Sequence, residues 1–99
     1  MPQKSSVIVK EITAHIEKQG GPYSAWYVGI AADVKKRLHE EHNVPRENYW
    51  FIYREAFNAD AARDAEATLL EYGCKGGTGG GDEDTRFVYA YLIGPETRE

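Results

Sequence analysis

The chain has 99 residues, 41% of them hydrophobic and 28% charged, which suits one globular domain and excludes an intrinsically disordered chain. Its net charge of -4 argues against a broad basic surface that coats nucleic acid. The lone Cys74 excludes an internal disulfide and a zinc finger, and no apolar run is long enough for a signal peptide or a membrane span. We therefore expect one domain over residues 1–99, located in the cytoplasm and not in a membrane.

The N-terminal part of the chain predicts a helix followed by a strand. Apolar side chains recur at helical spacing over residues 6–19, with Ser5 and Ser6 as candidate caps. Gly-Gly-Pro at 20–22 ends this helix, because glycine favours the left-handed cap and proline cannot continue it. Residues 25–30 (AWYVGI) are aromatic and β-branched, which indicates a buried strand.

The middle of the chain predicts a second helix and a second strand. Asp33 is a good cap for a helix that turns Val34 and Leu38 inward and most of its charged residues outward. A loop follows at 43–48 because it contains a proline. Residues 49–54 (YWFIYR) then indicate another strand.

The C-terminal part predicts a third helix and a third strand. Asn58 caps a run of good helix formers that extends to about Tyr72. A glycine-rich segment at 73–81 separates this helix from a strand at 86–93 (RFVYAYLI), and a polar tail follows. The predicted fold is therefore a small α/β (α+β) domain in the order α-β-α-β-α-β, whose three-stranded sheet packs against helices and contains at least one antiparallel pair.

A known motif is visible in the segment 26–42 (WYVGIAADVKKRLHEEH). Tyr-Val-Gly at 27–29 ends the strand, and Arg37 lies ten residues after the tyrosine on the next helix. This arrangement resembles the second half of the GIY-YIG nuclease motif, in which a Tyr-Ile-Gly strand leads into a helix with an arginine and a nearby histidine. Both His39 and His42 lie close to the histidine position.

The resemblance extends to the third predicted helix. Residues 62–73 (ARDAEATLLEYG) resemble the family helix that carries the metal-binding glutamate, and Glu66 occupies that place. The resemblance implies a metal-dependent nuclease in which Glu66 binds one Mg²⁺ or Mn²⁺ ion. Arg37 would hold the phosphate, and Tyr27 would take part in activating the attacking water. The expected partner is a nucleic acid, with DNA the first choice.

Glu66 is also unusual on physical grounds. Apolar residues lie seven and four positions before it and three and four positions after it, so its carboxylate falls inside the apolar stripe of the helix. Burying an unpaired carboxylate is costly, so Glu66 should meet a cation, a metal or a hydrogen-bond donor. The alternative to a metal site is a structural ion pair, with Arg37 as the candidate partner.

The other motif residues have structural alternatives. Arg37 can pair with Glu41 at the i,i+4 spacing on an exposed helix face. Tyr27 can be an aromatic residue of the core. His39 and His42 can be surface residues, and His42 can interact favourably with the helix dipole.

The glycine-rich segment supplies a further candidate site. Backbone N–H groups at Gly76, Gly77, Thr78 and Gly79 can form an anion-binding nest for a nucleotide or a phosphorylated ligand. The alternative is a long connection without a ligand. Asp82, just after this segment, can help to bind the metal or cap the loop.

The first half of the family motif, a strand with Gly-Ile-Tyr, has no counterpart before Tyr27. We hypothesise that the C-terminal strand fills the vacant sheet position. Either Tyr89 or Tyr91 would then point toward Tyr27, Arg37 and Glu66 and assist in activating water.

Three functions remain open from the sequence. The first is a GIY-YIG-like nuclease, and the second is a binding module that has kept the fold and lost catalysis. The third is a protein-interaction domain that uses its aromatic strands or the apolar face of its first helix, for example as a homodimer. A pocket around Glu66 and Arg37 would favour the first two, and metal binding at Glu66 would favour the first.

Overall fold

The computed structural model describes residues 2–45, 50–76, 84–95 and 97. In these ranges the chain forms one three-stranded sheet of β1 (Trp26–Ala31), β2 (Phe51–Glu55) and β3 (Phe87–Leu92). The strand order is β1-β3-β2, and both pairs are antiparallel, so the C-terminal strand is the central one. The predicted element order and the predicted antiparallel pairing are confirmed.

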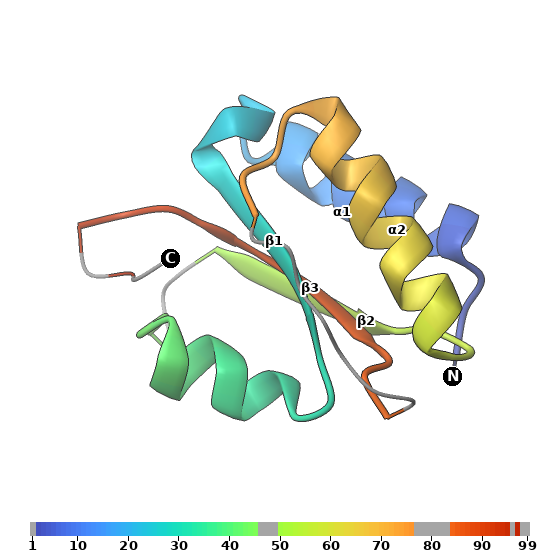
Figure 1. The fold of residues 1–99 in the computed structure, drawn as a ribbon. Coiled ribbons are helices and arrows are strands. Elements are labelled where there is room, and N and C mark those ends of the chain that lie inside the picture. Colours follow the sequence, from blue (N-terminus) through green and yellow to red (C-terminus); the bar gives the residue numbers. More distant parts are fainter. Residues whose placement is uncertain (1, 46–49, 77–83, 96, 98–99) are drawn as a thin grey trace.

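Helical segments cover both faces of the sheet (Figure 1). The helices α1 (Ser5–Lys18) and α2 (Ala59–Tyr72) lie together on one face. The helical residues 34–41 lie on the other face and end in a π-helical turn, η2 (Lys36–Glu41). A short 3₁₀ turn, η1 (Tyr23–Ala25), leads into β1.

The central strand β3 contributes to a hydrophobic core on each face. Successive side chains of a strand point to opposite faces, so Val88 and Ala90 pack with α1 and α2. Tyr89 and Tyr91 pack on the other face with Leu38 and its neighbours. The functional candidates on β3 therefore face the segment that contains Arg37 and His42.

The ends of α1 agree with the prediction, but its start is stabilised differently. The residue before the helix is Lys4, whose side chain makes no capping bond. The Ser5 hydroxyl instead donates to Asp64 Oδ2 at 2.7 Å, so the prediction of a serine cap was wrong. At the other end, Gly20 has φ +94°, a conformation that favours glycine and ends the helix as predicted.

The predicted caps of α2 are confirmed. The Asn58 side chain accepts a hydrogen bond from the Ala61 N–H at 2.8 Å, and Gly73 closes the helix with φ +117°. Side chains at 60, 64 and 71 point to solvent, as their positions off the apolar stripe predicted.

The apolar face of α1 is part of the protein's own core. Ile8, Ile12 and Ile16 are completely buried against the sheet and α2. In this fold the face is not available to a partner chain. None of the helices in the described ranges is both long and apolar enough to cross a bilayer.

Candidate functional site

Strand pairing places two of the candidate tyrosines side by side. Tyr27 of β1 lies opposite Tyr91 of β3, and their rings stack with centroids 5.4 Å apart. One step along the ladder, Gly29 lies opposite Tyr89. The C-terminal strand therefore lies directly beside the Tyr27 strand, which is the position that the hypothesis of a replaced strand requires.

The ring of Tyr89 lies directly over Gly29. A Cβ atom at Gly29 would be 2.4 Å from the Tyr89 hydroxyl and 2.5 Å from its Cζ atom, closer than real contacts allow. Glycine at this position of the Tyr-Val-Gly sequence thus makes room for a tyrosine of the neighbouring strand.

We expect Gly29→Ala to displace the Tyr89 ring and to lower the free energy of unfolding by about 1–3 kcal/mol, as overpacking does. The measurement is urea denaturation of the variant beside the wild type. In a Tyr89→Leu background the same substitution should cost clearly less, because the clashing ring is gone. Equal losses in both backgrounds would contradict this explanation.

His42 links the two tyrosines of β3. Its Nε2 atom lies 2.7 Å from the Tyr89 hydroxyl, and its Nδ1 atom lies 3.1 Å from the Tyr91 hydroxyl. The side chain is buried, with 7% of its surface exposed, and its ring also packs against Tyr27 at 4.9 Å. A surface location for His42, one of the sequence alternatives, was therefore wrong.

His42 joins the hydroxyl groups of the two β3 tyrosines, one through each ring nitrogen. A neutral imidazole carries one ring proton, so one of these nitrogens donates and the other accepts. The positive charge of Arg37 also acts on the Tyr89 hydroxyl. A hydrogen-bonded path thus leads from Tyr89 through His42 to Tyr91, with a cation beside it.

Tyr89 is kept protonated by its surroundings. Burial is the largest effect and raises the pKa of Tyr89 above its ordinary value, while Arg37 opposes part of this rise. Tyr27 and Glu66 raise the pKa further by electrostatic repulsion of a phenolate. Glu66 is on α2, which covers the opposite face of the sheet, so it acts on Tyr89 only through its charge.

Arg37 interacts with two neighbouring side chains. Its Nε atom lies 3.2 Å from Glu41 Oε1, so the predicted i,i+4 pair is formed. The same guanidinium reaches Tyr89, and 42% of the Arg37 side-chain surface remains exposed. A fixed and accessible cation therefore lies beside the buried hydroxyl groups.

Glu66 is buried in α2 with 8% of its surface exposed, as its position in the apolar stripe predicted. Burial raises the pKa of its carboxyl. No described residue forms a hydrogen bond or an ion pair with it, so the alternative pairing with Arg37 is not formed. Leu70, predicted on the same stripe, is 36% exposed instead. The Glu66 carboxylate is thus a desolvated anion without a cation in the described chain.

Glu66 is the described carboxylate that remains as a candidate metal ligand. In the described ranges no three His, Cys, Asp or Glu side chains gather in a way that could hold a metal by themselves. Mg²⁺ does not need such a cage, because it commonly binds one or two carboxylates and takes its other ligands from water and substrate phosphates. Glu66 can supply the protein ligand, whereas the second candidate, Asp82, lies outside the described residues.

Two further candidates, His39 and Gly76, make contacts that stabilise the fold. His39 Nδ1 lies 2.8 Å from the Val44 carbonyl oxygen, and its ring meets the edge of Phe51 at 5.2 Å, so it is not among the clustered residues. A Cβ atom at Gly76 would be 2.8 Å from the Val28 carbonyl oxygen, so this glycine permits close packing of the chain against β1. The nest residues Gly77, Thr78 and Gly79 lie outside the described residues.

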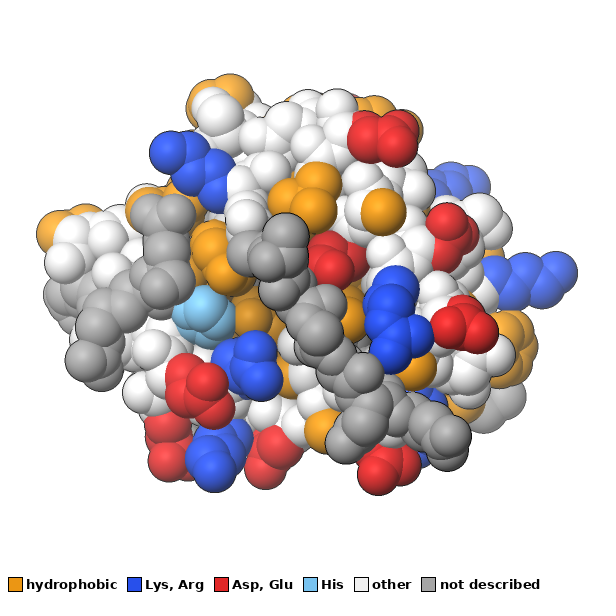
Figure 2. Space-filling model, in the orientation of Figure 1, with side chains coloured by type: hydrophobic (Ala, Val, Ile, Leu, Met, Phe, Trp, Pro, Cys, Tyr) orange, Lys and Arg blue, Asp and Glu red, His pale blue; other side chains and the backbone are white. Residues whose placement is uncertain are grey.

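The charge on this side of the molecule is mixed. Figure 2 shows basic and acidic side chains interspersed on the face it displays, without a continuous basic surface among the described residues. The basic cluster in the sequence, Lys35, Lys36 and Arg37, is at the start of η2. Attraction of a polyanion would therefore be local to this segment.

Comparison of the chain with protein-family models, with curated protein sequences and with solved structures found no significant match. These comparisons supply neither a substrate nor a reaction, so the chemistry must be inferred from the clustered side chains.

Proposed function

We propose that this protein is a metal-dependent nuclease of the GIY-YIG type that hydrolyses phosphodiester bonds in nucleic acid. The observation that carries the proposal is the cluster of Tyr27, His42, Tyr89 and Tyr91 beside the cation Arg37, together with the buried carboxylate of Glu66 on α2. An accessible cation, a desolvated carboxylate and a hydroxyl connected to an imidazole are the groups that phosphodiester hydrolysis uses.

Arg37 would bind the scissile phosphate. Its planar guanidinium can donate two parallel hydrogen bonds to phosphate oxygens, and its ion pair with Glu41 holds it in place. Charge accumulates on these oxygens during attack, so a positioned cation stabilises the transition state more than the bound substrate.

Tyr89 and His42 would activate the attacking water as a relay. The raised pKa keeps Tyr89 in its neutral form, so it can accept a proton from water only if its own proton moves on, and His42 Nε2 lies 2.7 Å from its hydroxyl. Water would give a proton to the Tyr89 oxygen while the Tyr89 proton moves to His42, leaving neutral tyrosine and an imidazolium. The water oxygen then bonds to phosphorus, and the bond from phosphorus to the leaving oxygen breaks. Tyr27, stacked on Tyr91 and His42, is the alternative acceptor.

Glu66 would hold the divalent cation. When bound, Mg²⁺ or Mn²⁺ supplies polarisation of the phosphate and stabilisation of the leaving oxygen. The cation would also remove the electrostatic cost of the buried Glu66 carboxylate, so substrate-dependent metal binding and the stability of this region are linked.

The proposal is tested by incubating the purified protein with plasmid DNA, single-stranded DNA and RNA in Mg²⁺, Mn²⁺ or EDTA. We expect cleavage in either metal, none in EDTA, and a loss of at least about 100-fold in Glu66→Ala and Arg37→Ala. Glu71→Ala on the exposed side of α2 and Lys10→Ala on α1 are matched controls that should cleave normally.

The outcomes separate the candidate functions. Cleavage that survives Glu66→Ala would contradict the assigned site. Failure of the folded wild type to cleave any of the substrates would favour the binding module, for which the net charge of -4 and the single carboxylate ligand are the supporting observations.

A further inference from the structure

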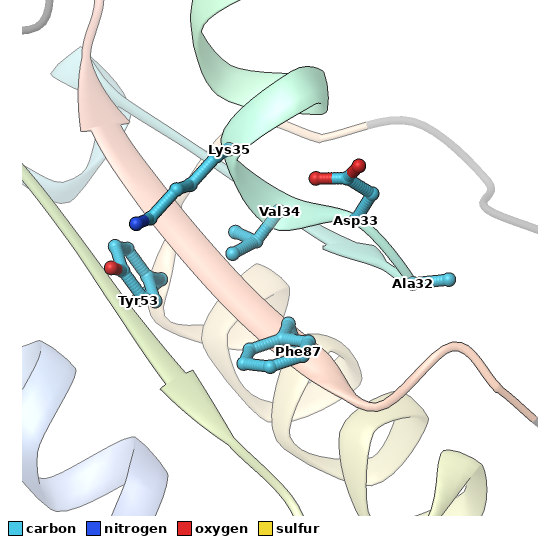
Figure 3. Close-up of a pocket in the computed structure, with 6 residues that line it drawn as sticks. All are labelled: Ala32, Asp33, Val34, Lys35, Tyr53 and Phe87. Atoms are coloured by element: carbon cyan, nitrogen blue, oxygen red, sulfur yellow. The ribbon is translucent and has the colours of Figure 1, made fainter.

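A pocket lies on the same face of the sheet as Tyr89 (Figure 3). Its volume is about 440 Å³, within the range of small-molecule sites. Six residues line it: Ala32, Asp33, Val34, Lys35, Tyr53 and Phe87. They come from the end of β1, the start of the following helix, β2 and β3, so the pocket is built by the sheet and its helical cover together.

Two aromatic rings form the apolar part of this pocket. Tyr53 of β2 and Phe87 of β3 are both partly exposed, with ring centroids 6.4 Å apart and ring planes at 67°. Because they meet at an edge, neither ring covers the other face to face. In Figure 3 both rings lie beneath the segment that carries Val34 and Lys35.

The polar part of the pocket is cationic. The Lys35 side chain extends toward the Tyr53 ring (Figure 3), and it forms no ion pair with the described residues. Asp33 points away from the rings and accepts a hydrogen bond from the Lys36 N–H at 3.1 Å, so its carboxylate serves the start of the helix. Aromatic surface beside an uncompensated ammonium matches the two parts of a nucleotide, a flat base and an anionic phosphate.

The pocket lies next to the proposed cleavage site along the sheet. Tyr53 lies opposite Tyr89 in the ladder, and Tyr89 lies opposite Gly29. Neighbouring strands are about 5 Å apart, so Tyr53 and Tyr89 are separated by a distance that one nucleotide can span. Lys35 and Arg37 belong to the same helical segment, but they are two residues apart, so their side chains leave it on different sides.

We propose that this pocket binds an unpaired nucleobase of the nucleic acid, stacked on Tyr53 and Phe87, with Lys35 on an adjoining phosphate. The inference rests on the proposed function and defines its substrate as single-stranded or locally unpaired. A base inside a duplex has both faces covered by its neighbours and cannot stack on a protein ring without leaving the helix.

The test is a fluorescence-anisotropy titration in EDTA, which permits binding without cleavage. The probes are a labelled single-stranded 12-mer, its duplex, and a 12-mer of abasic sites. The variants are Tyr53→Leu, Phe87→Leu and Lys35→Gln, with Tyr72→Leu and Lys10→Gln as exposed controls. Each protein is first shown to be folded by circular dichroism.

We expect Tyr53→Leu and Phe87→Leu each to weaken binding of the single strand about tenfold, and to leave binding of the abasic strand unchanged. Lys35→Gln should weaken both and reduce the dependence of affinity on salt. The control variants should bind as the wild type does, and the wild type should prefer the single strand over the duplex.

The two proposals fail in distinguishable ways. Three results would each overturn the base pocket. The aromatic variants could both bind with unchanged affinity, they could lose as much affinity for the abasic strand as for the normal strand, or the wild type could fail to bind. If the wild type never cleaves but shows the base-dependent losses, the pocket stands and the nuclease proposal fails. If the wild type cleaves but the aromatic variants bind with unchanged affinity, the nuclease proposal stands and the base pocket fails.

Discussion

Glu66→Gln is expected to abolish metal-dependent cleavage, by about 1,000-fold or more, and at the same time to stabilise the protein at neutral pH. Glutamine has nearly the same shape but neither the charge that binds a cation nor the cost of burying that charge. The free energy of unfolding at pH 8 without metal should rise by about 1 kcal/mol. Urea denaturation and the cleavage assay measure the two effects on the same protein.

The gain in the free energy of unfolding from Glu66→Gln should change with pH in a definite direction. Because burial raises the pKa of Glu66, the folded protein binds this proton more tightly than the unfolded chain does. This tighter proton binding stabilises the folded wild type fully below the pKa that Glu66 has in the unfolded chain. The stabilisation is lost as pH rises through the higher pKa that Glu66 has in the folded protein. The advantage of Glu66→Gln should thus be small at pH 4 and grow toward pH 8.

Two controls sharpen the result. Glu71→Gln, on the exposed side of α2, should show no such trend. Added Mg²⁺ should stabilise the wild type at pH 8 and leave Glu66→Gln unchanged, because only the wild type binds it. A variant that is less stable than the wild type at pH 8 would show that the carboxylate has a stabilising partner.

Tyr89→Phe should lower the rate of cleavage by about 100- to 10,000-fold, the range that general acid–base groups contribute. It removes the hydroxyl that is hydrogen-bonded to His42 and leaves the ring that packs on Gly29 in place. We expect the loss in kcat, with a smaller change in KM, because the relay acts in the transition state. Single-turnover cleavage in Mg²⁺ measures it.

The matched variants identify the water-activating group. Tyr91→Phe keeps the ring stacked on Tyr27 and removes the hydroxyl that is hydrogen-bonded to His42 Nδ1, which lies one step beyond the relay, so its effect should be smaller. Tyr27→Phe tests the alternative acceptor. If Tyr27→Phe costs more than Tyr89→Phe, the relay through His42 is wrong and Tyr27 is the group that activates water.

Local patterns predicted the elements but not how they are assembled. Periodicity and caps predicted both α-helices and all three strands, and the apolar neighbours of Glu66 predicted its burial. The vacant motif strand led to the hypothesis that β3 lies beside β1, but the pairing of β2 with the other edge of β3 could not be predicted, because strand order depends on contacts between distant residues. Ser5 failed as a cap for the same reason: its partner, Asp64, lies 59 residues away.

Two parts of the site show what a closer interpretation of the sequence can and cannot give. His42 follows Leu38 by four residues, a spacing that places both on one helix face, so its burial was open to prediction. The pocket formed by Tyr53, Phe87 and Lys35 was not, since it requires the register between β2 and β3. The alternation of side chains along one strand predicts which face of the sheet each residue occupies. Only the register with the partner strand determines which residue lies beside it.

The central position of β3 has a consequence for how the protein is made. A ribosome delivers both outer strands, β1 and β2, before the strand that pairs with each of them. Until β3 emerges, their backbone groups lack the ladder partner that the finished sheet provides, and neither core can close. Folding of this domain during synthesis is therefore held back until β3 has emerged, when one strand brings together the sheet, both cores and Tyr89.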